Sequence, residues 1–314
     1  MEKKICWSNL PHGDRPVLVL PVYKGGERFL RCLRSLDVAH LYFAAIVISV
    51  NSRSDSADLK HAFDFQTSAG LPVEVLNTQS ELSSMDHTRF WANELRRTGL
   101  RPEQMLMWIG HDDELDPDGL AFNCPNGVWP IDSNTMILGP WQLRHEGVDE
   151  LYQVPDGESL ETWTCFPPPN IKPVPSLEWV CSQLVHPTYL NLTGGIFSFG
   201  SMLQVIDFTY KKISGMRMEM TLATALGTRF VTELPTAITI VYGRADSDRA
   251  TIPVQHARQD DRQLLAWVTR YAFGSRQSRL RLASTIGSLF TLRLQVATGR
   301  GKFPEEDWVV RYDS

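Results

Sequence analysis

The sequence has no hydrophobic run long enough to cross a membrane, and its start does not resemble a leader. The longest mainly apolar stretch, Leu41–Val50, is well short of the roughly 18–20 residues that span a bilayer. Met1-Glu2-Lys3-Lys4 is followed by Ile5-Cys6-Trp7 and then by polar residues, not by the apolar core of a signal peptide. We therefore expect a cytoplasmic protein.

Cysteine is scarce, and an excess of positive charge is absent. The five cysteines form no Cys-x-x-Cys pair and have no metal-ligand spacing, which argues against a disulfide framework or a zinc site. With 36 acidic against 31 basic residues, the net charge is -5, so no nucleic-acid partner is expected. Neither a Gly-x-Gly-x-x-Gly fingerprint nor a P-loop is present, so dinucleotide dehydrogenases and P-loop NTPases are unsupported.

Four β-type runs in the first third of the chain point to a parallel sheet. Each is apolar on both faces, as in a strand covered on both sides, and their starts are about 30 residues apart, the length of one strand–helix–strand unit. The runs are Val17–Val22, Ala44–Val50, Val73–Leu76 and Met105–Ile109. The pattern predicts an α/β fold with a doubly wound, mostly parallel sheet.

Helices are predicted between these strands. In Glu27–Val38, apolar residues recur at helix spacing, which places Arg28, Arg31 and Arg34 on the surface. Asp55–Phe65 and Asp86–Arg97 are the next two candidates.

After Leu120 the regular alternation of predicted strands and helices ends. Strands are predicted at Thr135–Leu143, Gly194–Phe199 and Ala237–Tyr242, with a helix at Met216–Leu226. The proline-rich stretch Pro155–Pro175 predicts a loop or flap. The tail from Asp260 reads as two helices, the second at about Ser278–Val296.

Polar residues follow the predicted strands, at the sheet edge where open α/β sheets bind ligands. They include Tyr23 and Gly25-Gly26 after the first strand, Asn51 and Arg53 after the second, and Asn77 after the third. The fourth strand runs into Gly110-His111-Asp112-Asp113-Glu114.

This acidic cluster is the most specific signal. Adjacent carboxylates repel unless a cation or hydrogen-bond donors offset them, and Mg²⁺ or Mn²⁺ suits oxygen ligands. We predict a metal role for Asp112 and Asp113, whereas Asp116 and Asp118 read as the N-cap and first turn of a helix beginning at Pro117.

The order of these segments resembles the family 2 glycosyltransferases with the A-type (nucleotide-sugar) fold. The similar segments are Pro21–Leu36, Ile46–Asp55, Thr88–Asn93 and Trp108–Leu120, with a looser likeness over residues 190–250. The sequence departs from the family pattern at Gly110 and Asn51, where the family has aspartates, and at Met218, where it has a carboxylate beside the base. It also lacks the histidine that follows Tyr242 in the family pattern. The resemblance implies a catalytic domain over residues 1–250, with a nucleotide-binding half at about 16–122 and an acceptor half at about 123–250, and a helical extension over 251–314.

The resemblance also implies site roles. The nucleotide-sugar donor would contact Pro21, Val22, Tyr23, Glu27, Asn51, Arg53, Arg89, His111, Asp112 and Asp113. Asp112 would bind Mn²⁺ or Mg²⁺, Gly194 and Gly195 would lie on the acceptor side, and Glu219 would be the catalytic base.

The implied activity is inverting transfer of a sugar from a nucleoside diphosphate to a hydroxyl of a glycan or a lipid-linked acceptor, in surface polysaccharide biosynthesis. A metal-dependent nucleotide-sugar phosphohydrolase and a non-catalytic nucleotide- or sugar-binding relative remain open alternatives.

The C-terminal tail contains a basic segment that is also rich in leucine. Between Arg276 and Lys302 it carries six basic residues interleaved with leucines and no acidic one. Such a helix either contacts an anionic membrane surface at the inner face of the cell membrane or packs on the catalytic domain with a solvated basic face.

Overall fold

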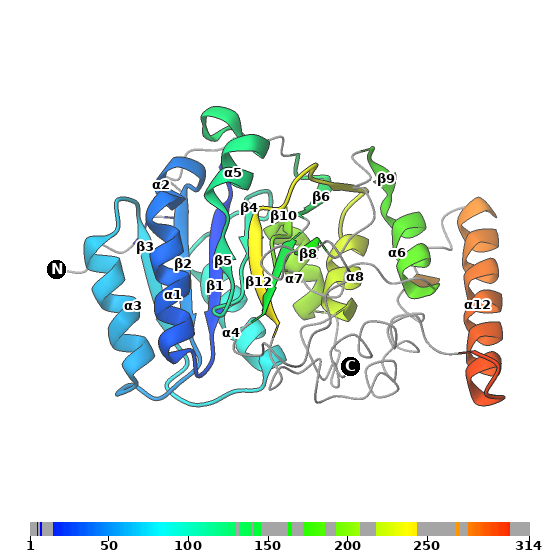
Figure 1. Ribbon diagram of the computed structural model, residues 1–314, viewed down its shortest axis with the longest axis horizontal. Helices are drawn as coiled ribbons and strands as arrows, with labels where there is room; N and C mark the ends of the chain where they lie inside the picture. Colours follow the sequence, from blue (N-terminus) through cyan, green and yellow to red (C-terminus); the bar gives the residue numbers. More distant parts are fainter. Residues whose placement is uncertain are drawn as a thin grey trace.

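The computed structural model describes residues 5, 7, 15–129, 132–139, 141–145, 163–164, 172–185, 193–207, 218–243, 268–269 and 276–301. The four predicted N-terminal strands are all present, as β1 (Val17–Val22), β2 (Ala45–Val50), β3 (Val73–Asn77) and β4 (Met105–Trp108). They pair in parallel in the order β3-β2-β1-β4. The sheet continues through β10 (Ile196–Ser198), β6 (Thr135–Leu138), β11 (Phe230–Glu233) and β9 (Val174–Pro175). This eight-stranded, mostly parallel sheet with helices on both faces confirms the predicted fold class (Figure 1).

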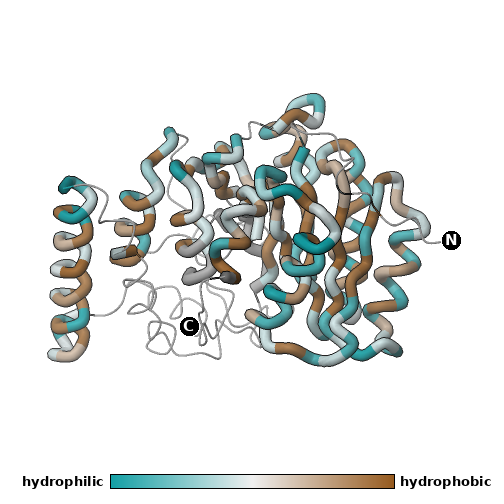
Figure 2. Tube along the Cα trace, turned by 180° about the vertical axis from the view of Figure 1, so that it is seen from behind, coloured by the Kyte–Doolittle hydropathy of each residue, from teal (hydrophilic) through white to brown (hydrophobic). Residues whose placement is uncertain are grey.

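Alternate residues of the strands enter two separate cores. Leu18, Leu20 and Val22 of β1 face one side, where they pack with α1 (Gly26–Ser35), α2 (Ala39–Tyr42), α3 (Ala57–Ser68) and α5 (Pro117–Asn123). Val17 and Val19 face the other side, which α4 (Ser84–Arg97), α6 (Ser176–Val185), α7 (Phe199–Asp207) and α8 (Met218–Leu226) cover. The central strands are mainly apolar in colour in Figure 2, and they lack an alternating pattern because both of their faces are buried.

A second, four-stranded sheet lies beside the first and corrects one prediction. It has the order β5 (Glu114–Leu115), β12 (Thr239–Gly243), β7 (Trp141–His145) and β8 (Trp163–Thr164). The single strand predicted over Thr135–Leu143 is therefore wrong: β6 belongs to the large sheet and β7 to the small one. The sequence Gly139-Pro140 separates them, since proline cannot donate to a strand ladder and glycine weakens one.

Helix α5 begins as predicted and is held close to β12. The Asp116 carboxylate caps it by accepting a hydrogen bond from the Asp118 N–H (3.2 Å), and Pro117 is its first residue. At Gly119, a Cβ atom would lie only 1.7 Å from the carbonyl oxygen of Ala237, so glycine is required for this approach. The capping role predicted for Asp116 is confirmed.

Other predictions were partly met. The helix expected at Glu27–Val38 ends at Ser35 and continues as a 3-10 turn, Leu36–Val38. The strand expected at Gly194–Phe199 ends at Ser198, where α7 begins. The last predicted helix is α12 (Arg276–Ala297), and most of the preceding tail helix lies outside the described residues. The described parts of Pro155–Pro175 include the two-residue strands β8 and β9, so the loop prediction is wrong there, and most of the remainder lies outside the described residues. None of the helices in the described ranges has the length and apolarity needed to cross a bilayer.

Candidate functional site

Three parallel strands end at one edge of the large sheet and carry predicted site residues there. Val22 of β1 lies opposite Val50 of β2, and Val19 lies opposite Trp108 of β4. The segments that follow, starting at Tyr23, Asn51 and Ile109, therefore leave the sheet at the same edge. The sheet topology therefore brings together residues that are up to about ninety positions apart in the sequence.

The loop after β4 folds its two carboxylates around Gly110. The Asp113 N–H donates to the Gly110 carbonyl oxygen (3.1 Å), which closes a tight turn. A Cβ atom on Gly110 would lie 2.6 Å from Asp113 Oδ2 and 3.0 Å from Asp112 Oδ1. Both carboxylates thus occupy the space beside Gly110, and a side chain at this position would require them to shift.

Thr193 holds the inner carboxylate in place. Its hydroxyl donates to Asp113 Oδ2 (2.7 Å) and accepts from the Gly110 N–H (3.1 Å), and both side chains are buried. The predicted residues Gly194 and Gly195 pair through their backbones with Trp108 of β4, at 2.8 and 3.0 Å, which fixes Thr193 beside the acidic loop. Sequence reasoning missed Thr193, because a single threonine about eighty residues away gives no local signal.

Arg31 supports the same loop from α1, which corrects its predicted surface position. Its Nε atom lies 2.7 Å from Glu114 Oε1, a terminal N–H donates to the Asp112 carbonyl oxygen (3.2 Å), and the guanidinium stacks 3.6 Å from the ring centroid of Tyr242. The Tyr242 hydroxyl donates to the same Glu114 oxygen (2.7 Å). One side chain therefore connects α1, β12 and both ends of the Asp112–Glu114 segment.

We expect Arg31→Met to loosen this segment. Breaking an ion pair whose side chains are only 25% and 17% exposed should lower the free energy of unfolding by about 2 kcal/mol. It should also weaken the binding of Mn²⁺ to the acidic loop by roughly tenfold, because contacts behind a carboxylate orient it toward a cation. Thermal denaturation and Mn²⁺ titration measure the two effects, and the exposed Arg34→Met on the same helix is the control. A lower melting temperature with an unchanged affinity for Mn²⁺ would leave Arg31 with a purely structural role.

The electrostatics beneath this loop favour a cation. Burial raises the pKa of the Cys32 thiol well above its ordinary value, and the charges of Asp113, Asp112 and Glu114 raise it further. Within the described ranges, no three His, Cys, Asp or Glu side chains converge as a complete metal centre. Mg²⁺ and Mn²⁺ need only one or two carboxylates when phosphate oxygens and water complete the shell. The half-buried Asp112 can supply such a carboxylate, whereas Asp113 behind it is buried and bonded to Thr193.

At the neighbouring strand ends, Asn51 and Tyr23 both contact the loop that follows β3. The Asn51 side chain donates to the Leu82 carbonyl oxygen and accepts from the Leu82 N–H, both at 2.8 Å, and its exposed fraction is 3%. Tyr23 is 43% exposed, and its hydroxyl donates to Glu81 (3.3 Å). In this structure the Asn51 amide positions the loop, while the Tyr23 ring is partly exposed, with the Lys24 ammonium 4.9 Å from its centroid.

The turn after β1 is closed by an acidic side chain from α3. The Asp58 carboxylate accepts hydrogen bonds from the N–H groups of Gly25 and Gly26, both at 2.9 Å. These donors are therefore not open to a phosphate group. His111 lies against this turn, since a Cβ atom on Gly25 would be 3.3 Å from His111 Cδ2.

His87 of α4 is a neutral, buried histidine near His111. Burial, with a smaller contribution from the charge of His111, lowers the pKa of His87 to about 4, and the His87 ring is hydrogen-bonded to the Ser49 hydroxyl at 2.8 Å.

The remaining predicted residues lie on other elements, and the side chain of one of them is outside the described part. Pro21 is half-buried and Val22 is fully buried, so Val22 contributes its backbone, whose carbonyl accepts from the Asn51 N–H (2.8 Å). Glu27 and Arg53 are exposed. Arg89 forms an ion pair with Asp86 on its own helix (3.0 Å). Glu219 lies in the first turn of α8, and its side chain is outside the described residues.

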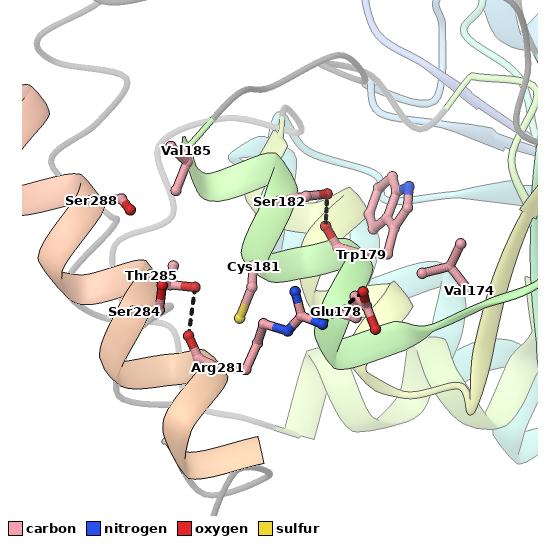
Figure 3. Close-up of a pocket in the computed structure, with 10 residues that line it drawn as sticks. All are labelled: Val174, Glu178, Trp179, Cys181, Ser182, Val185, Arg281, Ser284, Thr285 and Ser288. Atoms are coloured by element: carbon pink, nitrogen blue, oxygen red, sulfur yellow. Dashed lines mark hydrogen bonds and ion pairs between the residues drawn. The ribbon is translucent and has the colours of Figure 1, made fainter. Parts of the chain in front are cut away.

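A cavity of about 350 Å³ lies elsewhere, between α6 and α12 (Figure 3). Its lining includes the hydroxyls of Ser182, Ser284 and Ser288 and the ion pair of Arg281 with Glu178 (2.8 Å). None of the predicted site residues lines it.

Comparison with known proteins identifies the fold. No family model and no curated protein matches the sequence. Among solved structures, S. aureus TarS 1-349 matches with a TM-score of 0.53 at 12% identity, over 95% of this chain and 78% of that one. Its complex with UDP has the same TM-score at 13% identity, over 94% and 78% of the two chains. The mannosyltransferase PcManGT from Pyrobaculum calidifontis, in complex with GDP-Man and Mn²⁺, matches with a TM-score of 0.50 at 10% identity, over 98% of this chain and 88% of that one. The architecture is the A-type glycosyltransferase fold.

Proposed function

We propose that the chain is an inverting glycosyltransferase that moves a sugar from a nucleoside-diphosphate sugar to a hydroxyl group with the help of a divalent cation. The proposed acceptor is a glycan or a lipid-linked oligosaccharide of surface polysaccharide biosynthesis. The catalytic domain would cover residues 1–250, and residues 251–314 would form a helical extension.

One observation carries the proposal. The loop after β4 presents Asp112 and Asp113 at the same sheet edge as the exposed Tyr23, in a fold shared with structures that hold UDP or GDP-Man. The chemistry of this edge is acidic at one strand end and aromatic at another. This combination suits a nucleoside diphosphate bound with a cation. The base can stack on the aromatic ring, and the carboxylates can hold the cation that offsets the charge of the diphosphate.

The chain's own residues would divide the work as follows. Asp112, with Asp113 beside it, would hold Mn²⁺ or Mg²⁺, which when bound offsets the charge of the departing nucleoside diphosphate. Thr193 and Arg31 would keep the two carboxylates in position through the contacts described above. Tyr23 would support the base, and His111 would stand next to the diphosphate.

Glu219 would take the proton of the attacking hydroxyl. The acceptor oxygen then attacks the anomeric carbon from the face opposite the leaving group, which inverts that centre. The support for this role is the resemblance of Met218-Glu219, at the start of α8, to the family's base-bearing segment.

A panel of UDP-, GDP- and CMP-linked sugars tests the proposal. We expect one class of donor to bind only with Mn²⁺ or Mg²⁺, and its nucleotide to be released at least about tenfold faster when a hydroxyl acceptor is present. Release at the same rate without an acceptor would identify a phosphohydrolase instead. Cation-dependent binding with no release at all would identify a non-catalytic relative.

A further inference from the structure

Helix α12 has two apolar stripes, and only one of them is covered by the described part of the protein. Leu282, Thr285 and Leu289 recur at helix spacing, are buried, and face α6. Of the two alternatives left open by the sequence, packing against the rest of the chain holds for this stripe.

The second stripe is exposed. Ile286, Phe290 and Leu294 follow each other at four-residue spacing, with exposed fractions of 46%, 68% and 54%, and Leu280, six residues before Ile286, is 62% exposed. The other exposed large apolar side chains of the described ranges are dispersed over several elements. In Figures 1 and 2, α12 is the outermost of the coloured elements. An apolar stripe in this position indicates an interaction surface.

The charged residues beside this stripe are basic, which favours an anionic partner. Arg276 and Arg279 are exposed, and Arg279 lies seven residues before Ile286 on the same line of the helix. The segment from Arg276 to Lys302 contains no acidic residue. A second copy of α12 would therefore bring arginines against arginines with no carboxylate on the helix to pair with them. An anionic lipid surface offers negative charge and an apolar layer at once.

We propose that α12 lies on an anionic membrane surface through Leu280, Ile286, Phe290 and Leu294, with Arg276 and Arg279 at the lipid headgroups. The surface does not depend on the catalytic site. If the proposed transferase activity also holds, this contact would bring the enzyme to lipid-linked acceptors.

Vesicle flotation of the full chain tests the proposal, with phosphatidylcholine vesicles alone and with added phosphatidylglycerol. We expect binding to the anionic vesicles, at least about tenfold weaker binding to the neutral ones, and loss of binding at high salt. The variant Leu280→Ser/Phe290→Ser/Leu294→Ser should bind at least about tenfold more weakly, since it removes the apolar contact. Its control is Phe122→Ser, because Phe122 is 65% exposed on α5.

A second variant tests the charges. Arg276→Gln/Arg279→Gln should weaken binding to anionic vesicles roughly tenfold, while Arg34→Gln/Arg101→Gln, at exposed positions elsewhere, should change it by less than about twofold. Equal binding to both kinds of vesicle, no binding at low salt, or equal losses in the controls would overturn the proposal. So would a wild-type oligomer that the triple serine variant converts to monomers without any vesicle binding. Turnover of a soluble acceptor should be unchanged in all four variants, which separates this test from that of the proposed function.

Discussion

Asp112→Asn should abolish cation-dependent turnover of the nucleotide-sugar donor. The substitution keeps the size of the side chain but removes the charge that would hold Mn²⁺ or Mg²⁺ at the end of β4. We expect kcat/KM to fall on the order of a thousandfold, because the leaving diphosphate loses its counter-charge. Isothermal titration with donor, with and without Mn²⁺, should show that the Mn²⁺-dependent part of binding is lost.

The matched control is Asp118→Asn. Asp118 lies six residues later, is exposed in the first turn of α5, and is not expected to meet the donor. It should retain turnover within about twofold of the wild type, as surface changes usually do. If Asp112→Asn kept Mn²⁺-dependent binding, the cation site would have to be sought elsewhere. The acidic loop would then be only a structural turn held by Thr193 and Arg31.

Glu219→Gln should have the second largest effect, on turnover alone. An amide cannot accept the proton of the acceptor hydroxyl, so kcat should fall by about a hundred- to ten-thousandfold. The dissociation constant of the donor should change by less than about threefold, since the proposed base does not contact the nucleotide. Single-turnover transfer and donor titration measure the two quantities.

Glu103→Gln, at an exposed position before β4, is the control for loss of a surface carboxylate. Normal turnover in Glu219→Gln would remove this residue from the mechanism while leaving the cation site intact. Loss of donor binding would instead indicate that Glu219 supports the fold or the nucleotide pocket. The Asp112 and Glu219 results therefore test separate parts of the proposal.

The first half of the fold was predictable because its signals are local. Strands β1, β2 and β4 are buried on both faces, and so each appears as an uninterrupted apolar run. The Asp116-Pro117 start of α5 was also predictable, because a cap and the first helical residue are neighbours in the chain. The break between β6 and β7 has a local signal in Gly139-Pro140, which the prediction of one strand over Thr135–Leu143 overlooked, whereas the sheet that each strand joins depends on tertiary packing.

The site shows the same division between local and long-range information. Sequence alone determined an α/β chain with an acidic turn after its fourth strand, because residue type and strand spacing are written along the chain. Tertiary structure alone decided that Thr193 restrains Asp113, that the half-buried Arg31 contacts Glu114 and Tyr242, and that the Asn51 amide bonds the Leu82 backbone. These contacts join residues about thirty to more than two hundred positions apart, and their geometry depends on how strands and helices pack, which no local pattern encodes.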